Sequence, residues 1–258
     1  MRQFESSTFA QPERMEPRHQ DGRRAGGHFR SRLSLFVRRP APSEAQLQSS
    51  DIGHIRSPVL SFRNMHEFGD LLIRYLEARK SVFIDRLNWC VSEKDGMEFD
   101  QYDTPWCRWV ILHEFGEVIG GVRLMPTTAR CGIYSYMLRD AQLGILDDLP
   151  TDVLFLPAPV SPTVWEASRF FIVETVPAAR RMAVQQLLFR RMRESAAEHG
   201  ARILLGIVPS VWSRWARRID ATATPIGAKF SIDGTSSQSV LFNVQGQAPG
   251  LARKSSAA

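Results

Sequence analysis

The feature that most constrains this fold is a strand–helix–strand pattern between residues 163 and 208. Residues 163–174 are rich in β-branched and aromatic side chains, which is typical of a strand. Pro177 stands at the first-turn position that proline tolerates, and it opens a predicted helix that runs to about His199. Residues 202–208 predict a second strand. Two strands joined by a helical crossover pair in parallel, so the chain is predicted to be an α/β protein.

The elements around this unit make the predicted sheet mixed. Apolar residues at three- and four-residue steps from Met65 to Phe83 predict an amphipathic helix. Two apolar runs separated by a turn predict an antiparallel hairpin. Two more apolar runs near the end of the chain predict a second pair of strands. These predicted strands lie at 108–113, 118–124, 225–232 and 239–244, with short helices near 136–146 and 210–218. We expect one mixed sheet with helices on both faces, formed by residues 58–244.

Both ends of the chain differ from the middle in composition. Residues 1–57 are rich in Arg, Pro, Ser, Gln and Gly and predict a disordered basic tail, because they cannot bury enough apolar surface. Residues 245–258 predict a second disordered tail. A tail that binds nucleic acid is an alternative function, but a net charge of +6 is a weak argument for it. We therefore expect no nucleic-acid partner.

Cysteines, histidines and hydropathy exclude several classes of protein. The three cysteines are odd in number and lack a Cys-x-x-Cys pair, which disfavours a disulfide framework or a thiolate zinc site. The six histidines show no ligand spacing, so no metal is expected. No apolar run approaches the roughly 20 residues that cross a bilayer, and no secretory signal begins the chain. These features predict a cytoplasmic protein without a membrane partner.

An arginine stands inside the apolar stripe of the first predicted helix. Arg79 falls at the centre of the stripe between Leu72 and Phe83, where an unpaired charge would be very costly. One interpretation is an arginine that reaches solvent from the helix end, and the other is a charged pocket. Glu98, Asp100 and Asp103 are candidate partners, although such a run by itself is usually a solvated loop.

The predicted strands carry further charges. Arg123 lies on the returning strand of the hairpin, next to the pair Gly120-Gly121, which suggests a bulge or a close backbone approach. Glu166 and Arg169 lie within the apolar strand 163–174. Regular alternation places these two side chains on opposite faces, so they reach one site only if the strand bulges. Exposure of one of them at a sheet edge is the alternative.

Two aromatic residues lie at the end of the first predicted helix. Phe83 and Trp89 are each, taken singly, more typical of a core than of a binding site. Beside carboxylates, however, aromatic faces suit a cationic ligand, because a cation–π contact contributes about 0.5–2 kcal/mol. The aromatic pair therefore favours a ligand that carries positive charge.

Taken in order, these residues form motifs that match a known family. The motifs are Arg79-x-x-x-Phe83 followed by Trp89, Glu98-x-Asp100-x-x-Asp103, Arg123-Leu124-x-Pro126-Thr127-Thr128 and Trp165-Glu166-x-Ser168-Arg169-Phe170. The chain resembles the LuxI-type acyl-homoserine-lactone synthases across about residues 60–244. The resemblance implies the fold of the Gcn5-related N-acetyltransferases, a three-layer α-β-α sandwich with a mixed central sheet. It also implies acylation of S-adenosylmethionine from acyl carrier protein or acyl-coenzyme A, with an acyl-homoserine lactone and methylthioadenosine as products.

The resemblance assigns roles to the charged and aromatic residues. The expected binding site for S-adenosylmethionine is Arg79, Phe83, Trp89, Asp100, Asp103 and Arg123, and the expected reacting centre is Glu98, Glu166 and Arg169. Amide formation needs a neutral amine, and a carboxylate can remove its proton directly or through water. We expect Glu98 to be this base, with Glu166 as rival or partner. Both reactants are substrates, so no cofactor is implied.

The acyl donor is less well defined by the sequence. Residues 174–181 lack the glycine-rich loop with which acetyl-coenzyme A users hold pyrophosphate, which is compatible with a carrier protein. Arg180 and Arg181 begin a basic helix that is a candidate carrier contact, or equally a solvated face. Residues 129–162 match the family loosely. The resemblance places Gly206 where many family members that use 3-oxo-acyl groups have threonine, which favours an unsubstituted, branched or aromatic acyl group here. An N-acyltransferase acting on another amine or amino acid is the alternative function.

Overall fold

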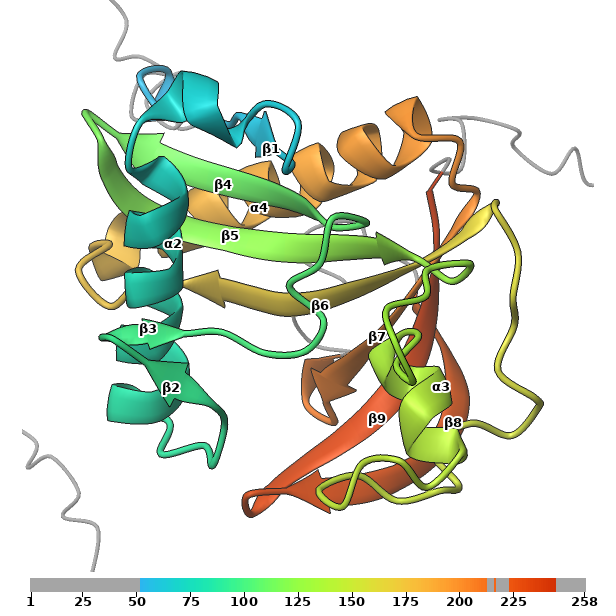
Figure 1. Ribbon diagram of the computed structural model, residues 1–258. Helices are drawn as coiled ribbons and strands as arrows, with labels where there is room; N and C mark the ends of the chain where they lie inside the picture. Colours follow the sequence, from blue (N-terminus) through green and yellow to red (C-terminus); the bar gives the residue numbers. More distant parts are fainter. Residues whose placement is uncertain (1–51, 213–215, 217–222, 245–258) are drawn as a thin grey trace, which may run out of the picture. The chain divides into compact units, whose positions relative to one another are not determined.

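The computed structural model describes residues 52–212, 216 and 223–244 (Figure 1). A seven-stranded sheet has the order β1-β4-β5-β6-β7-β9-β8. Its strands are β1 (Val59–Leu60), β4 (Arg108–Glu114), β5 (Glu117–Pro126), β6 (Val164–Ile172), β7 (Ile203–Pro209), β8 (Ala223–Ile232) and β9 (Thr235–Asn243). A two-stranded hairpin consists of β2 (Glu93–Lys94) and β3 (Met97–Glu98). The helices are η1 (Met65–Phe68), α2 (Leu71–Lys80), the π-helical turn η2 (Ser81–Arg86), α3 (Met137–Gln142) and α4 (Ala178–Glu198).

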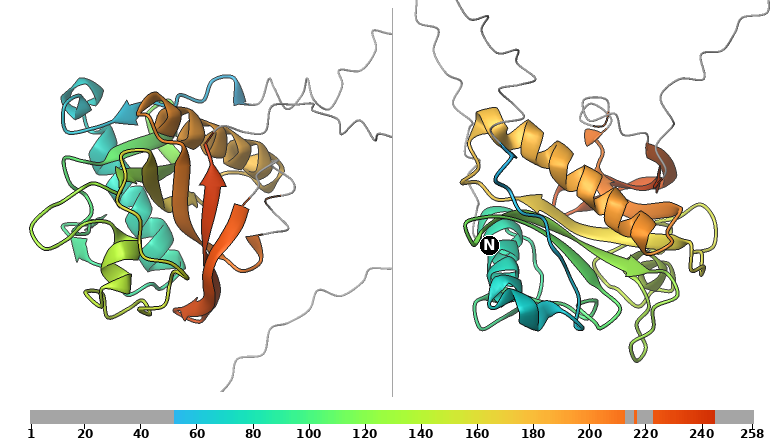
Figure 2. Two further views of the ribbon diagram at one scale, coloured as in Figure 1. Left: turned by 90° about the vertical axis from the view of Figure 1, so that its right-hand side faces the viewer. Right: turned by 90° about the horizontal axis from the view of Figure 1, so that it is seen from above.

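The sheet lies between two layers of helix. Helices α2 and α3 cover one face and α4 covers the other, as the two turned views also show (Figure 2). Among the strands that the structure describes, β6 and β7 pair in parallel and all other neighbours in the sheet are antiparallel. The predicted α/β fold with a mixed central sheet is confirmed. The site described below lies on the face that carries α2 and α3.

The predicted crossover unit is formed by β6, α4 and β7. Parallel pairing begins at Val164↔Ile203 and ends at Glu166↔Leu205, after which β7 pairs with β9 alone. The two central strands therefore separate beyond Glu166. Gly206 follows the last pair, and a Cβ there would meet the Ala167 carbonyl oxygen at 2.9 Å.

Strand β6 contains the bulge that the sequence requires if Glu166 and Arg169 are to lie on one face. Gly121 pairs with Phe171 but Arg123 pairs with Ser168, so β6 carries one residue more than β5 between these pairs. Arg169 occupies that position with a φ of 55°, a left-handed conformation that ordinary side chains rarely adopt. The close backbone approach predicted at the glycine pair also occurs. A Cβ on Gly121 would lie 2.6 Å from the Tyr75 ring.

Several predicted boundaries differ from the structure. Ile55 is buried and Arg56 bridges His113, so the predicted tail, which ends at residue 57, overlaps the folded unit. The predicted helix from Met65 to Phe83 is three segments, because the chain turns at Gly69 with a φ of 56° and α2 continues into η2. The predicted tails at 1–51 and 245–258, and most of the helix predicted at 210–218, lie outside the described residues.

Two negative findings hold for the described part of the chain. None of its helices combines the length and the hydropathy that a membrane crossing requires. Within the same residues, no three histidine, cysteine or acidic side chains are grouped as metal ligands.

Candidate active site

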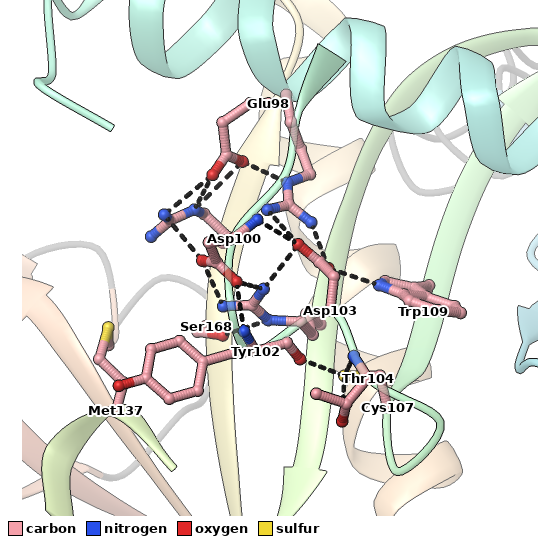
Figure 3. Close-up of polar contacts among 12 residues, drawn as sticks. Glu98, Asp100, Tyr102, Asp103, Thr104, Cys107, Trp109, Met137 and Ser168 are labelled. Carbon is pink, nitrogen blue, oxygen red and sulfur yellow. Dashed lines mark hydrogen bonds and ion pairs between the residues drawn. The ribbon is translucent and has the colours of Figure 1, made fainter. Parts of the chain in front are cut away.

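Arg79 is paired inside the protein with Glu98 and Asp103, two carboxylates that Figure 3 labels within a network of polar contacts. Its side chain has no exposed area, which excludes the alternative of an arginine that reaches solvent from the helix end. Nε donates a hydrogen bond to Glu98, and Nη1 and Nη2 donate to Asp103 Oδ1 and Oδ2 at 2.7 and 3.0 Å. The sequence-predicted charged pocket is thus formed by α2, β3 and the segment that follows β3.

Arg123 is the second buried arginine. From β5 it donates to both oxygens of Asp100 and, at 3.0 Å, approaches Asp103 Oδ2. Its Nε donates to Ser168 Oγ at 3.1 Å, and its Cζ lies 5.7 Å from the centre of the Tyr102 ring. Asp103 therefore joins the two arginines.

Arg169 closes the set from β6. Because the bulge turns its side chain toward the α2 face, Nη2 reaches Glu98 Oε1 at 2.9 Å and Asp100 Oδ2 at 3.0 Å. We call the six residues Arg79, Glu98, Asp100, Asp103, Arg123 and Arg169 the charged cluster. Three guanidinium groups thus face three carboxylates. Arg169 and Asp100 are 9% and 8% exposed and the other four have no exposed side-chain area, so the cluster reaches solvent at one edge.

The arginines keep the aspartates ionised. Burial acts to raise the pKa of Asp103, but Arg123 and Arg79 outweigh it and hold that pKa well below its ordinary value. Burial likewise opposes ionisation of Asp100, and Arg123 and Arg169 lower its pKa. Asp100 and Asp103 are therefore ionised around neutral pH, beside the guanidinium groups that lower their pKa values.

An aromatic pair stands beside the open edge of the charged cluster. The rings of Phe83 and Trp89 stack with centroids 4.9 Å apart. Arg169 Cζ lies 5.4 Å from the Phe83 ring centre, which connects the aromatic pair to the cluster. Trp89 is partly exposed and Phe83 is buried, so Trp89 is the accessible member of the pair.

Glu166 has a different environment from the clustered carboxylates. It is buried on β6, where Oε2 accepts a hydrogen bond from the Met137 amide at 3.0 Å and Oε1 from the Leu138 amide at 2.8 Å. Burial raises the pKa of Glu166 to about 7, although the two amides and Arg123 act to lower it. Glu166 can therefore exchange a proton near neutral pH.

Arg180 and Arg181 lie apart from this site, at the start of α4 on the opposite face. Arg180 donates to both oxygens of Glu114. Arg181 Nη2 donates to the carbonyl oxygens of Glu174 and Val176 at 3.0 and 3.1 Å. Both arginines thus have intramolecular partners.

Sequence reasoning gave no role to several residues that support the site. Trp109 Nε1 donates to Asp103 at 3.1 Å, and Tyr102 OH donates to the buried carboxylate of Asp140 at 3.0 Å. Tyr102 is next to Asp103 in the chain, Trp109 lies within the predicted strand 108–113, and Asp140 lies in the weakly matching stretch 129–162. The only signal for these hydrogen bonds is that the polar side chains are buried, and their burial cannot be read from the local sequence pattern.

Known proteins are similar to this chain in sequence and in fold. The model of the family described as autoinducer synthase matches residues 70–246. The chain belongs to this family. It is 35% identical over 162 residues to an acyl-homoserine-lactone synthase of Ralstonia solanacearum, covering 60% of this chain and 74% of that protein. It is 26% identical over 167 residues to the corresponding enzyme of Pseudomonas aeruginosa, covering 64% and 75% of the two chains.

Solved structures agree with this assignment. TofI, in a ternary complex with an inhibitor and MTA, has a TM-score of 0.58 and 29% identity, covering 73% of this chain and 91% of TofI. The acyl-homoserine-lactone synthase LasI has a TM-score of 0.61 at 21% identity, covering 74% and 91%, and supports the fold. The predicted family and activity are confirmed. The protein is an enzyme that makes an acyl-homoserine lactone and methylthioadenosine from S-adenosylmethionine and an acyl thioester.

Proposed function

We propose that S-adenosylmethionine binds at the open edge of the charged cluster and that Glu166 is the base for its acylation. The observation that carries this proposal is the meeting of the cluster with the Phe83–Trp89 pair. S-Adenosylmethionine carries a sulfonium, an ammonium and a carboxylate. A site with an aromatic face, an accessible aspartate and an accessible arginine offers a partner to each of these charges.

The members of the cluster divide between contact and support. Asp100 and Arg169 reach the surface, so they are the charged groups that meet the ammonium and the carboxylate of the substrate. Arg79, Asp103 and Arg123 are buried, and each holds a charged neighbour in place. Their contribution to substrate binding is to fix the geometry of the edge before the substrate arrives.

The geometry favours Glu166 over Glu98 as the base. Glu98 accepts one hydrogen bond from Arg79 and three from Arg169, so its oxygens are already held by guanidinium groups. Glu166 accepts only two backbone amides, and its pKa of about 7 suits proton transfer at neutral pH. We therefore assign Glu98 to the positioning of Arg169 and Glu166 to the removal of the amine proton, directly or through one water.

The two chemical steps make different demands on the site. The neutral amine attacks the thioester carbonyl, the nitrogen–carbon bond forms, and the carbon–sulfur bond breaks to release the carrier thiol. Backbone N–H groups at the bulge around Arg169 are the proposed donors to the tetrahedral oxyanion. In the second step the carboxylate attacks the carbon that bears the sulfonium and releases methylthioadenosine. Lactone closure needs orientation more than a new catalytic group.

The acyl group is proposed to lie where β6 and β7 separate beyond Glu166. Gly206 lies at the start of this separation and leaves room beside the Ala167 carbonyl, where a larger side chain would collide. The acyl donor is the acyl thioester of acyl carrier protein or of coenzyme A. Arg180 and Arg181 remain the proposed carrier contacts. These substrates belong to the cytoplasm, so we place the reaction there.

Product analysis tests the proposed substrates. The enzyme is incubated with S-adenosylmethionine and either acyl-coenzyme A or acylated acyl carrier protein, and products are identified by mass spectrometry. We expect acyl-homoserine lactone and methylthioadenosine in equal amounts with at least one donor. Acylated product from another amine, without lactone from S-adenosylmethionine under either condition, would instead support the alternative N-acyltransferase.

Removal of the accessible aromatic face should weaken substrate binding. Trp89→Ala is expected to raise the Kd for S-adenosylmethionine about 2- to 30-fold, because a cation–π contact contributes about 0.5–2 kcal/mol. Isothermal titration calorimetry measures the change. Trp106→Ala is the matched control, since this exposed tryptophan donates only to the Arg130 carbonyl and lies outside the proposed site. Equal affinities in the two variants would contradict the proposed role of Trp89.

A further inference from the structure

Asp140 is a second buried carboxylate near Glu166, and it lies in α3. Asp140 has no exposed area and accepts hydrogen bonds from the Ser135 amide, at 2.9 Å, and from the Ser135 hydroxyl. Its Oδ2 also accepts from Tyr102 OH at 3.0 Å. Asp140 is thus held from both sides, by its own loop and by the segment that carries the charged cluster.

This carboxylate connects the two halves of the proposed site. Tyr102 lies between Asp100 and Asp103 in the chain, so its backbone belongs to the cluster segment. Asp140 is in the same short helix as Met137 and Leu138, whose amides bind the carboxylate of Glu166. The Tyr102–Asp140 hydrogen bond therefore connects the substrate-binding segment to the short helix whose amides orient the base.

We propose that Asp140 and Tyr102 form a positioning pair, which holds the start of α3 so that its amides fix Glu166 relative to the charged cluster. This inference rests on the proposed role of Glu166 as base. Neither member of the pair touches substrate in this proposal. Both act through the placement of a third residue.

The charge of Asp140 also acts on Glu166. The charged and titratable groups that face Glu166 are Arg123 from β5, Asp140 from α3, Tyr136 before α3 and Tyr102 from the cluster segment. Burial is the largest cause that raises the pKa of Glu166, and the negative charge of Asp140 raises it further. Neutralising Asp140 should therefore lower the pKa of Glu166, whereas deleting the Tyr102 hydroxyl removes no charge at neutral pH.

A double-mutant cycle tests the pair on the full-length enzyme. Tyr102→Phe keeps the ring that packs over Arg123, and Asp140→Asn keeps the shape of the side chain. Each variant is expected to lower kcat about 10- to 100-fold through misplacement of Glu166, with the Kd for S-adenosylmethionine within about twofold of the wild type. The double variant should lose no more activity than the more impaired of the two single variants, because coupled residues act as one unit. In Asp140→Asn the acidic limb of the kcat/KM profile should also move to lower pH.

The controls separate positioning from loss of folding and from failure of the base assignment. Tyr134→Phe alters a tyrosine that packs edge-on against Tyr102, and its hydroxyl makes no hydrogen bond within the described residues; it should behave as wild type. The proposed pair would be overturned if the two single losses in kcat multiply in the double variant. It would also be overturned if the acidic limb of the kcat/KM profile does not move in Asp140→Asn. Glu166→Gln is measured in parallel. Full turnover there would overturn the base itself, whereas an inactive Glu166→Gln beside a fully active Tyr102→Phe would overturn the pair alone.

Discussion

Arg79→Ala is expected to destabilise the enzyme by about 3–5 kcal/mol and to abolish measurable lactone synthesis. The substitution leaves Glu98 and Asp103 buried without their shared guanidinium, and an uncompensated buried charge costs this much. The pKa of Asp103 should rise toward its ordinary range, because Arg79 is one of the groups that lower it, together with Arg123 and the Asp100 amide. Urea unfolding at neutral pH measures the change in the free energy of unfolding.

A control within the same helix separates this effect from a general loss of positive charge. Arg74 also pairs with two carboxylates, Asp70 at 2.8 Å and Glu117 at 3.1 Å, but its side chain is 41% exposed. Exposed ion pairs contribute little, so Arg74→Ala should unfold at nearly the wild-type urea concentration and keep full activity. Similar destabilisation in the two variants would show that burial of the cluster is not what makes Arg79 important.

Glu166→Gln is expected to lower kcat by about 100- to 10,000-fold with the protein still folded. This range is the usual contribution of a positioned general base. The glutamine amide keeps the volume of the side chain but cannot take the amine proton. It can also accept only one of the two hydrogen bonds from the Met137 and Leu138 amides. Steady-state kinetics at saturating substrate measure kcat, and calorimetry should show retained affinity for S-adenosylmethionine.

The pH dependence of the wild type belongs to the same prediction. Burial raises the pKa of Glu166 to about 7, so the base is protonated below that pH. Activity should therefore fall as the pH drops through about 7 and should be retained above it. For stability the sign is the reverse. The buried carboxyl favours the folded state most when it is protonated, and that contribution is lost as the pH rises from the ordinary value of 4.5 to about 7. A flat kcat/KM profile between pH 5 and 8 would argue against Glu166 as the base.

The choice between two carboxylates shows how the site depends on local surroundings. Glu98 and Glu166 are both buried glutamates. Glu98 is held by two guanidinium groups, whereas Glu166 meets backbone amides and a distant charge. One side chain is therefore suited to positioning and the other to proton transfer, although the residue type is identical.

Local pattern was enough for the crossover unit and for the first sign of the site. The strand 163–174, the helix after Pro177 and the strand 202–208 follow from periodicity and from proline placement, and the structure contains all three. An arginine at the centre of an apolar stripe requires buried partners, which Arg79 has. The ordered motifs then identified the family. The crossover unit and the buried partners follow from short-range periodicity and the cost of burying a charge, which can be read along the chain, whereas the family follows from the resemblance of the motifs.

Tertiary structure alone decided how the charges pair and which of them can act. Arg169 meets Glu98 across 71 positions of the chain, and it does so only because one extra residue in β6 turns it onto the face of α2. Burial in the folded protein raises the pKa of Glu166, and the α3 amides that bind its carboxylate lie 28 and 29 positions away. Strand register, burial and long-range contacts set these features, and they depend on the whole folded chain. The sequence by itself therefore determined the fold class and the set of charged residues, while the folded structure determined the role of each.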